Sequence, residues 1–231
     1  MKKKTIDYFN IGLGLNDQFF LLKEILKNKS FLRASHNNFL KKKVRLRGKT
    51  ADLGSGKKND YIKFILKDNF KIDNYDFYKK NNSTNSINLE MKFNLKKKKY
   101  KNILLFNVME HVKNKNLLIK SISSSLSKNG NLEIFIPFLY RFHGDPNDYY
   151  RFTHKYLEDF LQKYKFKTKI YLISAGPFNV ILEILFKYFK FKILRIIFSP
   201  FFILLNIIFS IISKDFKNYY CGVHCSCIKI K

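Results

Sequence analysis

The sequence predicts an α/β fold built on a doubly wound, mainly parallel sheet of seven strands. From residue 44 to residue 174, short apolar runs alternate with segments of helical periodicity, and a glycine-rich turn follows the first run. Strands that alternate with helices form parallel sheets with short, right-handed crossovers. The chain has 231 residues, which is enough to bury a substantial core in one domain.

The individual elements follow from the spacing of apolar residues. Apolar positions three and four apart over residues 17–43 predict two leading helices. In chain order we expect strands over 44–53, 70–77, 103–108, 132–136, 168–174 and 221–230, and helices over 61–66, 117–126 and 156–164. Asn129-Gly130 is expected to end the helix that begins at residue 117, and the polar residues 79–86 are expected to form a loop.

These elements predict four segments. Residues 1–43 form N-terminal helices, and residues 44–177 form the core that would bind a nucleotide-type cofactor. Residues 178–215 form an apolar helical insertion, and residues 216–231 return as the last strand of the sheet.

The insertion is almost continuously apolar over residues 178–212. Glu183, Lys187 and Lys190 form one polar stripe of a helix that Pro200 is expected to interrupt. A spanning helix needs about 20 apolar residues, so a run shortened by Pro200 is the weakest candidate for one. Two interpretations stay open: a buried helical pair over the sheet, or an interfacial hairpin on a membrane surface.

Charge and cysteine content say less about function. The formal net charge is +28, but the basic residues are nearly all lysine and are spread through the chain, as in the runs 41–43 and 96–99. Nucleic acid is therefore the less favoured partner, because its signature is a clustered, arginine-rich patch. The N-terminus lacks the apolar core of a secretory signal, so we expect a cytoplasmic protein.

Three cysteines lie near the C-terminus, with His224 among them. Cys221, Cys225 and Cys227 would share one face of a strand, and their spacing matches no common zinc motif. We expect small buried side chains there, and no metal site.

Polar residues gather where the predicted strands end. Asp52, Gly54 and Gly56 follow the first strand, and Asp76, at the end of the second, could accept hydrogen bonds from a ribose. Residues 107–112, Asn-Val-Met-Glu-His-Val, end a buried strand. A loop rich in aromatic and charged residues follows Pro137 and runs to Thr153.

These motifs resemble those of the class I S-adenosylmethionine-dependent methyltransferases, in particular the methyltransferase type 11 group. Residues 50–56, Thr-Ala-Asp-Leu-Gly-Ser-Gly, are similar to the first motif of that family, and residues 103–112 to its fourth-strand motif. Residues 127–132 resemble its turn before the fifth strand, and residues 137–153 its His-x-x-Pro-x-Asp-Tyr-Tyr-Arg-x-Thr loop. The third glycine of the family falls at Lys58.

The resemblance implies S-adenosylmethionine as the cofactor. It assigns cofactor binding to Asp52, Gly54, Ser55, Gly56, Asp76, Asn88, Asn107 and His111. It also implies that Asp148, Tyr149, Tyr150 and Arg151 bind the methyl acceptor.

The chemistry required of the chain depends on the acceptor atom. A hydroxyl must lose its proton, and His143, with His111 as the second candidate, is the expected general base because histidine exchanges protons near neutral pH. We expect methyl transfer to oxygen of a small-molecule or glycan acceptor. The alternatives are an RNA methyltransferase that uses the basic surface and a non-catalytic scaffold at a membrane.

Overall fold

The computed structural model describes residues 6–56, 60–77, 84–95, 100–144 and 146–230. Lys58, the N-terminal lysines and the run 96–99 lie outside the described residues. Contacts divide the chain into two compact units. Unit 1 contains Met1–Val44, Pro137–Arg141 and Tyr171–Val223, and unit 2 contains Arg45–Ile136, Phe142–Ile170 and His224–Lys231.

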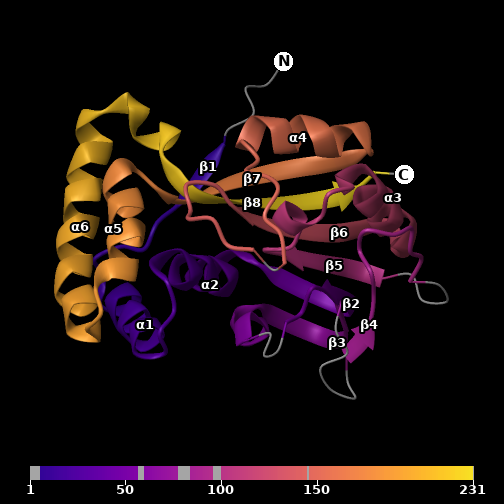
Figure 1. The fold of residues 1–231 in the computed structure, drawn as a ribbon, viewed down its shortest axis with the longest axis horizontal. Coiled ribbons are helices and arrows are strands. Elements are labelled where there is room, and N and C mark those ends of the chain that lie inside the picture. Colours follow the sequence, from indigo (N-terminus) through magenta and orange to yellow (C-terminus); the bar gives the residue numbers. More distant parts are fainter. Residues whose placement is uncertain (1–5, 57–59, 78–83, 96–99, 145, 231) are drawn as a thin grey trace. The chain divides into compact units, whose positions relative to one another are not determined.

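The sheet has eight strands in the order β1-β7-β8-β6-β5-β2-β3-β4. Their bounds are β1 Asp7–Phe9, β2 Arg45–Leu53, β3 Leu66–Asp76, β4 Thr84–Ser86, β5 Tyr100–Phe106, β6 Leu126–Pro137, β7 Phe166–Ala175 and β8 Tyr220–Lys229. The predicted α/β class and parallel pairing are confirmed. Two strands lie outside the predicted ranges: β1, which pairs parallel with β7, and β4, which pairs parallel with β3. In unit 2, β2 lies between β3 and β5, and both pairs are parallel (Figure 1). The strand order therefore reverses at β2, where ligands bind in open α/β sheets.

Six α-helices and three 3₁₀ turns complete the described part of the chain. The helices are α1 Leu15–Leu26, α2 Phe31–Lys43, α3 Lys115–Ser125, α4 His154–Lys163, α5 Pro177–Tyr188 and α6 Lys192–Ile212, and the turns are η1 Asp60–Phe64, η2 Met109–His111 and η3 Lys214–Asn218. Ser30, Asn114 and Thr153 cap α2, α3 and α4 by accepting a backbone N–H with their side chains. Such caps satisfy the unpaired amides of a helix start.

Three local predictions for unit 2 were wrong. The helix expected over 61–66 is the short turn η1, and part of the expected loop 79–86 is the strand β4, which pairs with β3. The Asn-Gly pair at 129–130 does not end a helix, because α3 ends at Ser125 and β6 begins at once. Asn129 has a φ of +56° and lies where the register of β5 and β6 shifts. Asn129 and Gly130 therefore belong to an irregular stretch of β6 that has more residues than the facing part of β5.

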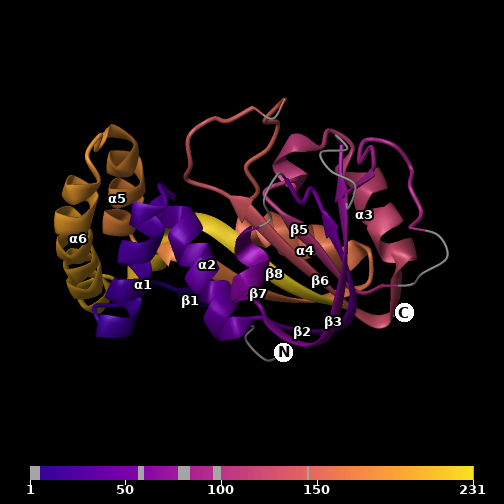
Figure 2. The ribbon, with the colours of Figure 1, turned by 90° about the horizontal axis from the view of Figure 1, so that it is seen from below.

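Unit 1 is organised around a core that joins α1, α2, α5 and α6. Leu21, Phe31, Leu182, Phe186 and Ile203 are among its buried residues. Figure 2 shows α1 and α5 beside α6 within this unit. These contacts hold the apolar insertion as a hairpin of two helices against the N-terminal helices.

The prediction that Pro200 would end a helix was also wrong. The chain breaks earlier, between Tyr188 and Lys192, and α6 continues through Pro200 for 21 residues. Proline costs about 3 kcal/mol in a helix interior. The second half of α6 is held by tertiary contacts: Ile203 is in the core, and Asn206 donates to the carbonyl of Ala175 at 2.9 Å.

The C-terminal strand agrees with the sequence prediction. Cys221, Cys225 and Cys227 are buried and reduced, and His224 is buried against Glu133 at 2.9 Å. The three thiols are therefore part of the packed sheet.

Candidate functional site

A cavity of about 500 Å³ opens in unit 2 where β2, β3 and β5 end. Six of the residues predicted to bind the cofactor line it: Gly54, Gly56, Asp76, Asn88, Asn107 and His111. They come from four separate stretches of the chain, and the parallel sheet brings them to one edge. We call this cavity the strand-end cavity.

The glycine turn forms one wall of the strand-end cavity. Gly54 has a φ of +77°, and a Cβ added there would lie 2.3 Å from Cγ2 of Val108. Gly56 has a φ of +64° and donates its backbone N–H to Oδ2 of Asp76 at 2.8 Å. Both glycines therefore hold a backbone conformation that side chains disfavour, and the turn is tied to the end of β3.

Two residues predicted to bind the cofactor lie behind this wall. The Asp52 carboxylate is fully buried and accepts a hydrogen bond from the Tyr61 hydroxyl at 2.6 Å. Ser55 is buried as well, and within the described part of the chain its hydroxyl makes no hydrogen bond. Neither side chain lines the strand-end cavity, and Asp52 instead ties the turn to Tyr61.

The opposite wall comes from the segment after β4. Asn88 accepts the backbone N–H of Glu90, and Glu90 accepts the backbone N–H groups of Lys113 and Asn114 at 2.6 and 3.1 Å. Asn107, which directly follows β5, has a φ of +52°, a conformation that asparagine adopts more readily than most residues. The hydrogen bonds of Asn88 and Glu90 hold this irregular segment against the backbone at Lys113 and Asn114.

A second group of polar residues lies beside this cavity. The buried carboxylate of Glu110 has its Oε1 3.7 Å from Nε2 of His111 and 3.9 Å from Nε2 of His143. The two imidazole rings pack edge to face with centroids 5.0 Å apart. We call Glu110, His111 and His143 the histidine cluster. Since His111 also lines the strand-end cavity, the cluster adjoins it.

The loop after β6 holds His143 in place. Asp148 accepts the backbone N–H of His143 at 2.9 Å, and its carboxylate lies 3.3 Å from Nδ1 of the same ring. Arg151 Nη2 donates to Asp148 at 2.6 Å. Burial alone would raise the pKa of Asp148, but the hydrogen bonds from Arg151 and the His143 amide outweigh it and lower this pKa from 3.8 to about 2.

The residues predicted to bind the acceptor are thus divided between two places. Tyr149 lines the strand-end cavity, whereas Asp148 and Arg151 bond within the loop. The Tyr150 hydroxyl donates to the carbonyl of Lys113 at 3.0 Å. Glu110 was not among the predicted site residues, although an acidic residue inside a buried apolar run was the signal that marked it.

The residues of the strand-end cavity fit a nucleoside-type cofactor. Ligand sites have volumes of about 300 to 1,000 Å³. The glycines keep one wall free of side chains, and Asp76 provides a carboxylate that a ribose could bond. The buried hydroxyl of Ser55, which bonds none of the described residues, lies in the same turn.

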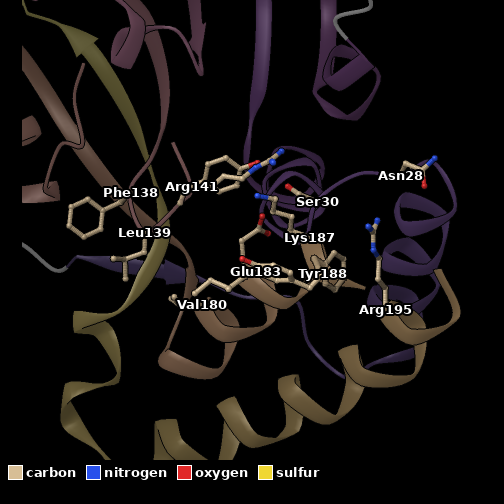
Figure 3. A pocket seen from close by; sticks show the side chains of 13 residues that line it. Asn28, Ser30, Phe138, Leu139, Arg141, Val180, Glu183, Lys187, Tyr188 and Arg195 are labelled. Atoms are coloured by element: carbon tan, nitrogen blue, oxygen red, sulfur yellow. The ribbon is translucent and has the colours of Figure 1, made fainter. Parts of the chain in front are cut away.

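A separate cavity of about 600 Å³ lies within unit 1 (Figure 3). Its walls come from the turn before α2, the loop after β6, and helices α5 and α6. Arg141, Lys187 and Arg195 contribute cationic groups, and Phe138 and Tyr188 contribute aromatic rings. We call it the helical cavity.

Glu183 is the acidic residue of the helical cavity. Burial raises the pKa of Glu183 to about 7, although hydrogen bonds from the Leu32 amide and the Ser30 hydroxyl act in the opposite direction. The Leu32 N–H lies 2.5 Å from Oε2 of Glu183. This carboxylate therefore ties α5 to the first turn of α2.

The reversal of strand order, the glycine turn and the acidic residue at the end of β3 define a Rossmann-like protein with a nucleoside-cofactor site. Comparisons with solved structures agree on the fold. The O-methyltransferase of a trans-AT polyketide synthase from Brevibacillus brevis, solved with S-adenosylhomocysteine, matches with a TM-score of 0.52 and 16% identity, over 99% of this chain and 84% of that chain. The plantazolicin methyltransferase BamL, also with S-adenosylhomocysteine, matches with a TM-score of 0.50 and 14% identity, over 94% and 91% of the two chains.

A third similar structure is the cyclase SpnF, with a TM-score of 0.54, 9% identity and coverage of 96% and 98%. Because this fold also carries a cyclase, it does not by itself determine the reaction. A search of curated proteins found no match.

The family is shown by the sequence comparison. The sequence model of a methyltransferase domain family, methyltransferase family 23, matches residues 26–183, which is more than half of the chain. The chain belongs to this methyltransferase family. It is an S-adenosylmethionine-dependent methyltransferase, and S-adenosylmethionine is its cofactor.

Proposed function

We propose that the protein methylates an oxygen atom of a small-molecule or glycan acceptor, and that His143 is the residue through which the acceptor hydroxyl is activated. The observation that carries this proposal is the histidine cluster beside the strand-end cavity. Asp148 fixes the His143 ring from the Nδ1 side, so that Nε2 lies toward Glu110 and His111. A basic side chain oriented by a carboxylate is the usual arrangement of an activated catalytic group.

The reaction requires little covalent chemistry from the protein. S-adenosylmethionine supplies a methyl group on a positively charged sulfur, an already activated carbon. The bond between the acceptor oxygen and this carbon forms as the carbon–sulfur bond breaks, with its electron pair left on sulfur. The chain must therefore orient the acceptor and remove its proton, and orientation alone can lower a barrier by about 7 to 11 kcal/mol at best.

Labelled methyl transfer tests this function. The protein should bind S-adenosylmethionine in calorimetry and, with cofactor labelled in the methyl group, should label a small molecule or glycan in cell extract, identified by mass. The control is the same extract without the protein. Label in the RNA fraction alone, or cofactor binding without any labelled product, would contradict the proposal.

The second part of the proposed function concerns where the enzyme works. We propose that α6 lies on the surface of an anionic membrane, with the enzyme on the cytoplasmic side. This helix is long and apolar enough to cross a membrane, with a mean hydropathy of 2.2, yet only 17% of the relevant stretch is buried. It is therefore not the buried helix that one interpretation of the sequence predicted.

The distribution of residues on α6 is inverted relative to a soluble helix. Two of its polar residues, Ser199 and Asn206, are buried, and Asn206 bonds the backbone of Ala175. Its outward residues recur every three or four positions and are all apolar: Ile193, Ile197, Phe201, Leu204, Ile208 and Ile211. At about 1.5 Å per residue this stripe is nearly 30 Å long.

Two features support a lipid surface as the partner. Protein interfaces carry about one hydrogen bond per 100 to 200 Å² and a polar rim, whereas this stripe offers no polar side chain. Exposed lysines flank it, Lys187 and Lys190 before α6 and Lys214 and Lys217 after it, as in helices that bind anionic lipid. Because α5 and α1 cover the inner side of α6, the helix is expected to lie in the membrane plane.

Vesicle flotation tests this orientation. The full chain should float with phosphatidylcholine vesicles that contain 30% phosphatidylglycerol, and binding should fall at least tenfold in the double variant Ile197→Glu, Ile208→Glu, because each carboxylate would enter apolar lipid. The matched control is Leu66→Glu, Ile228→Glu, since these side chains are similarly exposed, 45% and 47% against 57% and 44%. Circular dichroism confirms that both variants fold.

Three outcomes would contradict the membrane proposal. The wild type could fail to float, or the α6 variant could bind as well as the wild type. The third is a wild-type dimer in sedimentation that the α6 variant abolishes, combined with no flotation, since a second copy would then cover the face.

A further inference from the structure

We infer that the histidine cluster is a binding site for one divalent metal cation. The inference rests on the proposed function, because it names how the acceptor hydroxyl is activated at that site. One ligand atom each from Glu110, His111 and His143 can be chosen so that all three lie within 4.8 Å of one another. Two imidazoles and one carboxylate are a common donor set for divalent first-row metals.

The neighbours of both imidazole rings favour this role. Nδ1 of His111 bonds the backbone carbonyl of Asn147, and Nδ1 of His143 lies 3.3 Å from the Asp148 carboxylate. A carbonyl or an ionised carboxylate only accepts, so these neighbours favour a proton on Nδ1 of each ring. In a neutral ring of that kind the lone pair is on Nε2, the atom that lies toward Glu110 in both residues.

This pattern is how proteins prepare histidines for metal binding. Metal-ligating histidines almost always donate their other N–H to a carboxylate or a backbone carbonyl, which fixes the tautomer and the ring orientation. Here a backbone carbonyl lies against Nδ1 of His111, and a carboxylate lies against Nδ1 of His143. Both rings therefore direct Nε2 toward the buried carboxylate of Glu110.

The charges of the histidine cluster also fit a cation. The Glu110 side chain is fully buried, and Nε2 of each imidazole lies within 4 Å of its Oε1. A divalent cation held by these three groups would place positive charge beside the buried carboxylate.

The cation changes the role of His143 and leaves the proposed reaction intact. A hydroxyl bound to a divalent cation has a much lower pKa, so its proton leaves to solvent water near neutral pH. The resulting oxyanion attacks the methyl carbon as described above. His143 then acts as a metal ligand, and Asp148 and Asn147 act as positioning residues.

Direct metal binding tests the inference without relying on turnover. We expect the chelator-treated full chain to bind about one equivalent of Mn²⁺ or Zn²⁺ in calorimetry, with Mn²⁺ also followed by loss of its free electron paramagnetic resonance signal. Glu110→Gln and His143→Ala should each weaken binding at least tenfold. His154→Ala, a histidine on α4 outside the cluster, is the matched control and should bind as the wild type does.

Methyl transfer measured on the same samples separates this inference from the proposed function. Labelling of the acceptor that survives chelation, with no binding of either cation, would overturn the inference and leave the function standing. Metal binding that the cluster variants do not weaken would also overturn it. Metal binding lost in those variants, without any methyl transfer, would support the site and contradict the proposed function.

Discussion

Gly54→Arg should abolish measurable binding of S-adenosylmethionine. Gly54 has a φ of +77°, and even a Cβ at this position would lie 2.3 Å from Val108, another residue that lines the strand-end cavity. A larger side chain would have to displace that wall or enter the cavity. Isothermal titration calorimetry on the purified variant measures the loss, with circular dichroism to confirm that the chain is folded.

Gly14→Arg is the matched control for this substitution. Gly14 precedes α1, has no positive φ, and a Cβ there would meet no atom within 4 Å. The control should bind the cofactor with the affinity of the wild type. If a folded Gly54→Arg protein also bound normally, the glycine turn would not be part of the cofactor site.

His143→Ala should slow methyl transfer at least 100-fold while changing cofactor affinity less than twofold. Activation of a hydroxyl through a positioned side chain typically contributes about 10² to 10⁴ in rate. The His143 side chain adjoins the cavity through His111 without lining it, so the cofactor should lose no direct contact. Single-turnover labelling at saturating cofactor measures the rate, and calorimetry measures the affinity.

His154→Ala is the control that shows whether the loss of rate is specific to His143 or follows from replacing any histidine. His154 begins α4 and contributes to neither cavity. It should keep the wild-type rate. Equal rates for His143→Ala and the wild type would remove His143 from the chemistry and leave the acceptor to be activated elsewhere.

Much of the fold was predictable because its signals are local. Continuous apolar runs correctly located the strands β5 and β6, and glycine spacing correctly located the turn after β2. The errors fall where long-range contacts outweigh local preference. Pro200 signals a helix end, yet Ile203 and Asn206 hold α6 together beyond it.

The extra strand β1 illustrates the same limit. Only three residues long, it has no periodicity that a sequence pattern could detect. Its pairing with β7 depends on residues more than 160 positions away along the chain. Such pairing becomes visible only when the chain is folded.

The sequence by itself determined the α/β class, the glycine turn and the motifs of a methyltransferase, because each depends on residues that are neighbours along the chain. Only the tertiary structure decided that Glu110 lies beside His111 and His143, and that α6 buries Ser199 and Asn206 while it exposes a stripe of apolar residues. The physical reason is that the direction of a side chain is set by packing between distant segments. Asp148 orients the His143 ring, and the backbone at Ala175 bonds Asn206.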